Sequence, residues 1–286
     1  MRAIDPIFVA PRYVSRHWGR RDLGDWLKGH PIPAEAVGEV WVHEAANGTG
    51  SGPLGRRLSA SSKDMLGDLG RAPPRMRLVF PEETTSIKST APVSLWTVLE
   101  PGVTTPSDAG QVAHRPGERL RVYEGAAVTL PAGSVALEVS ASFQPRNELQ
   151  SDPSIIRMPP VSRRMRATLF RDDALSAELW TLPEWSRISP DGETCHVIAA
   201  LTPGVVLDGR SLAPGAAVFI PAWGRPLDLT GAGSRVLVAY PDHTPTAVWR
   251  HAPGPDPAAG QLPLPPRAPR SSAAAATDRE ILNIAA

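Results

Sequence analysis

Gly125-Ala-Ala-Val-Thr-Leu-Pro-Ala132 returns later in the chain as Gly215-Ala-Ala-Val-Phe-Ile-Pro-Ala222, with six of eight positions identical. A glycine, four or five extended residues and a proline are typical of a short strand that a tight turn opens and that a residue without an N–H donor closes. Each copy follows a second shared phrase, Leu99-Glu-Pro-Gly-Val103 or Leu201-Thr-Pro-Gly-Val205. Short strands at this spacing predict a sandwich or small barrel, and a period of about 90 residues is too long for a solenoid, so we expect two duplicated domains.

The composition predicts a globular, mostly β protein. The chain has 286 residues, 42% of them hydrophobic, and its 32 prolines and 24 glycines interrupt any long helix. Helical patterns are confined to the first 75 residues, at Asp22–Leu27 and at Ser62–Leu69. The fold class is therefore predicted as all-β, a double barrel of jelly-roll type with a few short helices near the amino terminus.

Charge and cysteine content exclude several classes of partner. Thirty basic and 29 acidic residues give a formal net charge of +1, which attracts the chain neither to nucleic acid nor to an anionic membrane. The single cysteine, Cys195, cannot form an internal disulfide, and the sequence has no export signal or long apolar run. We therefore expect a cytoplasmic protein.

The repeat and the proline distribution predict three parts of the chain. Residues 1–160 are expected to form an amino-terminal barrel with a short helical insertion, and residues 161–251 a carboxy-terminal barrel. Residues 252–286 are rich in proline and alanine and too poor in large apolar residues to pack, so we expect a disordered tail.

The sequence resembles the class I mannose-6-phosphate isomerases, a family of double cupins. Gly125 to Gly133 matches the second cupin motif, Gly-x-x-x-x-x-Pro-x-Gly, and further matches follow one another in the family's order from Phe8 to Pro241. They are Trp18-Gly19, Val37-Gly-Glu-Val-Trp41, Lys88 to Leu99 with its Trp96, Leu130-Pro-Ala-Gly-Ser-Val135 and Val238-Ala-Tyr-Pro241. The resemblance implies a double cupin of carbohydrate metabolism, an aldose-ketose isomerase activity and a zinc ion in the first barrel.

The residues that hold zinc in that family do not recur in this sequence. Phe80 leads to Lys88 within a few residues, so the Gln-Val-His-Pro segment with two of the ligands is missing. Ser94 stands where the family's glutamate precedes Trp96, and Ala136 stands where its second histidine follows the Gly-Thr-Val phrase. A divalent ion needs three or four converging ligands, which serine and alanine do not supply. We therefore expect no metal and no other cofactor.

Two cations are candidates for binding a sugar phosphate. Arg146 is the nearest counterpart of the family's arginine over the reacting end of the sugar, and Lys88 begins the resembling strand. Arginine offers a planar fork of donors and lysine a point charge, so both suit a phosphate. Arg146 is the only candidate for a catalytic role, and solvated surface charge is the alternative interpretation of both side chains.

The leading hypothesis is a pseudoenzyme: a metal-free, catalytically impaired isomerase relative that binds a sugar phosphate or a protein partner. One alternative is an active enzyme that interconverts mannose 6-phosphate and fructose 6-phosphate at a non-standard metal site, for example one that uses His114. Another is a purely structural or assembly protein. The sequence decides neither the sugar, nor the oligomeric state, nor the role of the proline-rich tail.

Overall fold

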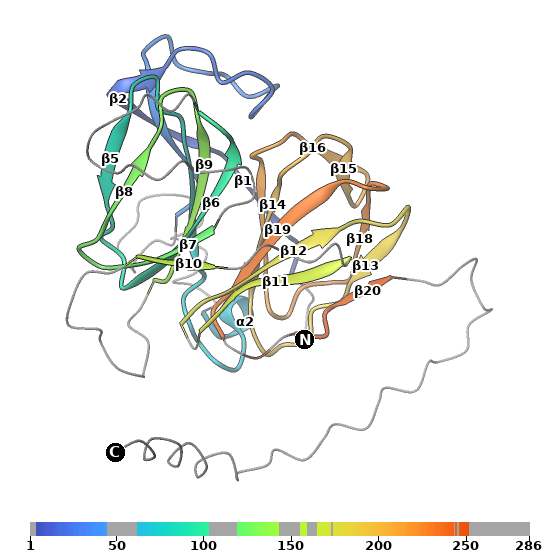
Figure 1. Cartoon of the computed structure of the whole chain (residues 1–286). Coiled ribbons are helices and arrows are strands. Elements are labelled where there is room, and N and C mark those ends of the chain that lie inside the picture. Colours follow the sequence, from blue (N-terminus) through green and yellow to red (C-terminus); the bar gives the residue numbers. More distant parts are fainter. Residues whose placement is uncertain are drawn as a thin grey trace, which may run out of the picture. The chain divides into compact units, whose positions relative to one another are not determined.

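The computed structural model describes residues 4–44, 62–102, 119–142, 155–158, 165–172, 174–242, 244 and 246–251. Apart from one short helix, the regular secondary structure of these residues consists of strands, as Figure 1 shows, which confirms the predicted fold class. The only helix in these ranges, α2, is Ser62–Leu66, so it ends before the predicted Leu69. Gly67 stops it because this residue adopts a left-handed conformation, with φ of +86°. The other predicted helical segment, Asp22–Leu27, lies in a series of turns.

The first half of the chain forms a seven-stranded antiparallel sheet and a two-stranded sheet. The larger sheet has the order β10-β7-β6-β9-β4-β3-β2, and the smaller pairs β5 with β8. Strand bounds are β2 Arg12–Arg20, β3 Val37–His43, β4 Arg75–Val79, β5 Thr85–Lys88, β6 Val93–Glu100, β7 Arg119–Tyr123, β8 Ala127–Leu130, β9 Val135–Ser140 and β10 Ile155–Met158.

The second half repeats this arrangement. One sheet has the order β1-β17-β14-β19-β12-β11 and the other β16-β15-β18-β13-β20. Strand bounds are β1 Ile7–Val9, β11 Arg166–Arg171, β12 Ser176–Thr181, β13 Ser186–Ile188, β14 His196–Ala200, β15 Val205–Leu207, β16 Arg210–Leu212, β17 Ala217–Ile220, β18 Leu227–Thr230, β19 Arg235–Tyr240 and β20 Trp249–His251. The order β4-β9-β6-β7 in the first half corresponds to β12-β19-β14-β17 in the second, and β5-β8 corresponds to β13-β18.

This correspondence corrects the alignment of the repeated phrase. Gly125–Ala132 supplies β8 of the smaller sheet, but Gly215–Ala222 supplies β17, which lies beside β14 in the larger one. The true partner of β8 is β18, and the Gly-Ser pairs that open β9 and β19, at Gly133 and Gly233, lie 100 positions apart. The phrase misled the alignment because a glycine turn, an extended run and a proline specify a short strand without specifying its neighbours.

The two halves are joined by strands, hydrogen bonds and a common core. Strand β1 comes from the segment predicted to belong to the first half, yet it pairs with β17 of the second. The Leu27 amide donates to the Pro214 carbonyl at 2.7 Å, and Arg121 forms an ion pair with Asp172 at 2.5 Å. The largest hydrophobic cluster contains buried side chains from both halves. The predicted boundary at residue 160 and the predicted tail, 252–286, lie outside the described residues.

His43 lies where β3 meets β17 of the other half. Its ring stacks on Phe219, with 5.9 Å between ring centroids, and its Nδ1–H donates to the Pro74 carbonyl at 2.8 Å. Burial lowers the pKa of His43 to about 4, against the opposing effect of that hydrogen bond. His196 on β14 is equally buried, and burial lowers its pKa to about 4 as well.

We predict that stability falls as the pH drops from about 6.5 toward about 4. Unfolded imidazoles have a pKa of about 6.5, so in this window the unfolded chain binds more protons than the folded chain. Each buried histidine then costs roughly 1.4 kcal/mol of unfolding free energy per pH unit. Urea unfolding at several pH values measures the slope. His43→Gln should make it shallower, whereas His17→Gln, at an exposed position, should not change it; equal slopes for all three proteins contradict the assignment.

Candidate functional site

The candidate site is the interior of the first barrel, because the two positions that correspond to zinc ligands face into it. Ser94 on β6 and Ala136 on β9 are completely buried. Ala136 belongs to a hydrophobic cluster formed by the larger sheet together with β8, and the indole of Trp96 in that cluster donates to the Ser94 hydroxyl at 3.1 Å. Both positions therefore lie on the interior face of the sheet, but they are not adjacent: Ser94 is opposite Ser140 of β9, whereas Ala136, four residues before Ser140, is opposite Val98.

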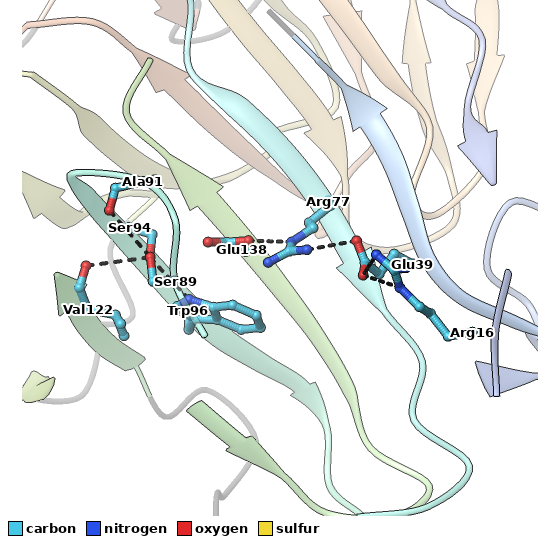
Figure 2. A network of polar contacts seen from close by, with 9 residues as sticks. All are labelled: Arg16, Glu39, Arg77, Ser89, Ala91, Ser94, Trp96, Val122 and Glu138. Carbon is cyan, nitrogen blue, oxygen red and sulfur yellow. Dashed lines mark hydrogen bonds and ion pairs between the residues drawn. The ribbon is translucent and has the colours of Figure 1, made fainter. Parts of the chain in front are cut away.

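A buried row of ionised groups crosses this interior, as Figure 2 shows. Arg77 on β4 donates through Nε to Glu138 on β9, and through Nη1 to Glu39 on β3 at 2.7 Å. Glu39 also accepts a hydrogen bond from Arg16 on β2 at 2.8 Å. Glu39, Glu138 and Arg77 are each less than a tenth exposed, so the row joins four strands with two cations and two carboxylates.

The charges of this row stabilise one another against burial. Burial acts to raise the pKa of Glu39, but the charge of Arg77 and hydrogen bonds from Arg16 and Arg77 outweigh it, so this pKa lies below its usual value. Burial likewise acts to lower the pKa of Arg77, but Glu138 and Glu39 raise it above its ordinary value. Both groups are therefore ionised at neutral pH, and Glu39 does not suit the role of a general base, whose pKa must lie near the working pH.

The motif Val37-Gly-Glu-Val-Trp41 brings Glu39 into this row. Gly38 permits a close crossing of β2 and β3, because a Cβ at this position would lie 2.5 Å from the Arg16 Cβ and 2.7 Å from the Trp18 ring. The strands can therefore approach closely enough for Arg16 to reach Glu39. Trp41 at the end of the motif lies 5.1 Å from the Arg77 guanidinium, within the range of a cation–π interaction.

We predict that Gly38→Ala destabilises the protein by about 1–3 kcal/mol, the usual cost of an overpacked contact. Chemical denaturation measures the change. Ser15→Ala on the neighbouring edge strand β2 is the control, since its side chain is exposed and such changes usually stay within about 0.5 kcal/mol. Equal unfolding midpoints for the two variants contradict the close crossing.

The described side chains of this interior do not fit a divalent ion. A guanidinium has no lone pair to give a metal, and it engages both carboxylates that reach the centre of the barrel. At the two positions that correspond to zinc ligands in the resembling family, the side chains end in a hydroxyl group, at Ser94, and in a methyl group, at Ala136. Over the described ranges, no three His, Cys, Asp or Glu side chains are grouped so as to hold a metal ion.

The second barrel contains the same ion pair with its charges exchanged. Matching the strands of the two halves places Glu178 of β12 at the position of Arg77, and Arg166 of β11 at the position of Glu39. Arg166 donates to Glu178 through Nε at 2.6 Å and through Nη2 at 3.0 Å. The indole of Trp180 and the hydroxyl of Tyr240 complete the donors to this carboxylate. Each barrel is therefore tied between the same two strands by a buried ion pair.

Sequence reasoning identified Ser94 and Ala136 but missed the ionised row. Lys88, predicted to bind substrate, lies at the end of β5 with its side chain exposed. Arg146, predicted to be catalytic and substrate-binding, and His114 lie outside the described residues. The signal for the row was present: Arg77 and Glu138 are charged residues at alternate positions of otherwise apolar strands, which indicates a charge on a buried face.

Comparison with known proteins shows the fold. No protein-family model and no curated protein matches the sequence. The structure resembles the mannose 6-phosphate isomerase from Bacillus subtilis, with a TM-score of 0.58 and 19% identity over 82% of this chain and 99% of that one. It also resembles the apo form of mannose 6-phosphate isomerase from Salmonella typhimurium, with a TM-score of 0.63 and 13% identity over 85% and 100% of the two chains.

This chain therefore has the cupin-type fold of the mannose-6-phosphate isomerases. The likeness extends over most of both chains, in agreement with the resemblance from Phe8 to Pro241. In the described ranges, no helix has the length and apolar character needed to cross a bilayer.

We predict that Arg77→Met destabilises the protein by about 3–5 kcal/mol, because it leaves two buried carboxylates without a counter-charge. Denaturant unfolding at neutral pH measures the loss. The control is Arg12→Met, which breaks an exposed ion pair with Glu44 on the same sheet and should cost less than about 1 kcal/mol. If the two substitutions cost the same, the row does not stabilise the barrel.

Proposed function

We propose that this protein is a metal-free relative of the mannose-6-phosphate isomerases that binds a sugar phosphate without isomerising it. The observation that carries the proposal is the Arg77 guanidinium, which Glu39 and Glu138 hold inside the first barrel, the barrel in which the resemblance implies a zinc ion. The fold supports a ligand related to those of its structural neighbours, and the side chains at the ligand-equivalent positions argue against a catalytic ion.

The chemistry of isomerisation supports the same conclusion. Moving a proton between adjacent carbons requires a cation that polarises the sugar oxygens and a base with a pKa near neutrality. The guanidinium of Arg77 is already neutralised by two carboxylates, and both carboxylates are engaged as its partners. The row therefore resembles a structural tie more than a set of catalytic groups. We place the protein in the cytoplasm within the same proposal, since Cys195 is buried and alone.

Metal analysis and an activity assay test the loss of catalysis. We expect purified protein to contain far less than one zinc per chain, and to form no fructose 6-phosphate from mannose 6-phosphate in a coupled assay, with or without added zinc. Stoichiometric zinc together with turnover would overturn the proposal in favour of an active isomerase with a non-standard site.

A thermal-shift series tests the binding. Mannose 6-phosphate, fructose 6-phosphate and glucose 6-phosphate are compared with unphosphorylated mannose. A ligand that binds only the folded protein raises the melting temperature, and at 100 times its Kd it adds about 2.7 kcal/mol. We expect at least one sugar phosphate, but not mannose, to stabilise the protein. No shift with any of them contradicts sugar-phosphate binding and favours a structural role or a protein partner.

A further inference from the structure

Arg75 is a cation at the edge of the barrel interior. It opens β4, two residues before Arg77 on the same face of the strand, and its side chain is partly exposed. Its Nε is buried and makes no hydrogen bond, and within the described part of the chain the guanidinium forms no ion pair. The charges of Arg16, Glu39, Arg77 and Glu138 balance among themselves. The positive charge of Arg75 is therefore left without compensation.

Hydroxyl groups lie beside this guanidinium across the sheet. Ser140 on β9 is directly opposite Arg75, and Ser94 on β6 is directly opposite Ser140. Directly opposite residues of antiparallel strands have Cβ atoms about 4.5–5.5 Å apart, so the three side chains form a continuous row. Ser89 extends it, with its Oγ 3.4 Å from that of Ser94. A partly exposed cation thus adjoins three buried hydroxyls.

The hydroxyl protons of this row are available to a ligand. Ser94 lies 3.5 Å from the Val122 carbonyl that it reaches, and Ser89 lies 3.4 Å from the Ala91 carbonyl. Both distances are at the long limit for O–H···O bonds, which are normally 2.5–3.0 Å. Figure 2 shows these long contacts beside the ionised row. Little bonding energy is lost if either hydroxyl turns toward a stronger acceptor.

The second barrel provides an internal comparison. The strand correspondence places Ser176, Tyr240 and His196 at the positions of Arg75, Ser140 and Ser94. All three have partners inside the barrel: Ser176 donates to the Asp242 carbonyl, Tyr240 to Glu178, and His196 contacts the Thr246 hydroxyl at 2.9 Å. The same layer is thus filled and free of cations in the second barrel, but carries an uncompensated cation in the first.

We propose that Arg75, Ser140, Ser94 and Ser89 form the anion site of this protein and bind the phosphate group of its sugar phosphate. A phosphate offers several acceptor oxygens, which match the planar fork of a guanidinium and the hydroxyls beside it. The bound dianion supplies the counter-charge that Arg75 lacks. Exposed Lys88 directly precedes Ser89 and adds a point charge at the rim. This assignment rests on the proposed function and names the residues that carry it.

Calorimetric titration with mannose 6-phosphate, inorganic phosphate and mannose tests the site in the full chain. Arg75→Gln should weaken binding of mannose 6-phosphate by about tenfold or more, the value expected for loss of charge-assisted hydrogen bonds. Ser140→Ala should weaken it less, because it keeps the charge. Arg187→Gln is the matched control: it removes an equally charged side chain from an exposed ion pair in the second barrel and should leave the affinity unchanged. Denaturant midpoints of all variants establish that they fold.

The outcomes separate this site from the proposed function. If mannose 6-phosphate binds the wild type and Arg75→Gln equally well, the site is wrong and the proposed function stands. If inorganic phosphate binds in an Arg75-dependent way and sugar phosphates bind no better, the anion site stands and the sugar-phosphate function is wrong. If none of the three compounds binds the folded wild-type chain, both are wrong.

Discussion

The first barrel depends on one buried guanidinium, that of Arg77, held between the carboxylates of Glu39 and Glu138. Ionised groups in a protein interior are tolerated only when they are paired and hydrogen-bonded, so the three side chains require one another. Because they come from β3, β4 and β9, their pairing also fixes these strands side by side. The centre of the barrel is thereby occupied by a charge of the protein's own.

The second barrel also contains an ion pair between the corresponding two strands, but the positive and negative residues have exchanged strands. Arg166 and Glu178 occupy the positions of Glu39 and Arg77, so the ion pair is kept while its direction is reversed. Coulomb attraction between two opposite charges does not depend on which strand carries which sign. The indole of Trp180 donates to this carboxylate, and the indole of Trp96 donates to Ser94 in the first barrel. Duplication of the fold therefore preserved the interaction but not the sequence.

The proposed anion site follows from the same balance of charges. The ionised row is neutral, and Arg75 in the layer beside it has no ion-pair partner among the described residues; Ser140, Ser94 and Ser89 follow it across the sheet. In the second barrel the residues of that layer, Ser176, Tyr240 and His196, each form a hydrogen bond with another group of the protein. The two halves thus differ in whether this layer contains a charged side chain that has no ion-pair partner among the described residues. The proposed anion site and the ionised row lie in neighbouring layers of the same sheet. Substitutions in the two layers can therefore be compared, to separate an effect on ligand binding from an effect on stability.

The sequence by itself determined the fold class and the short helix near Ser62, because strand periodicity and turn residues act locally. The serine and alanine at positions 94 and 136, which face the interior, were identified through the resemblance to the isomerase family and not through a local pattern. It did not determine which strands are neighbours, so the repeated phrase was aligned to the wrong strand and β1 was assigned to the wrong half. Only the tertiary structure brought Arg77 between Glu39 and Glu138, residues 38 and 61 positions away in the chain. Pairing across such separations depends on strand order and register, which no local pattern encodes.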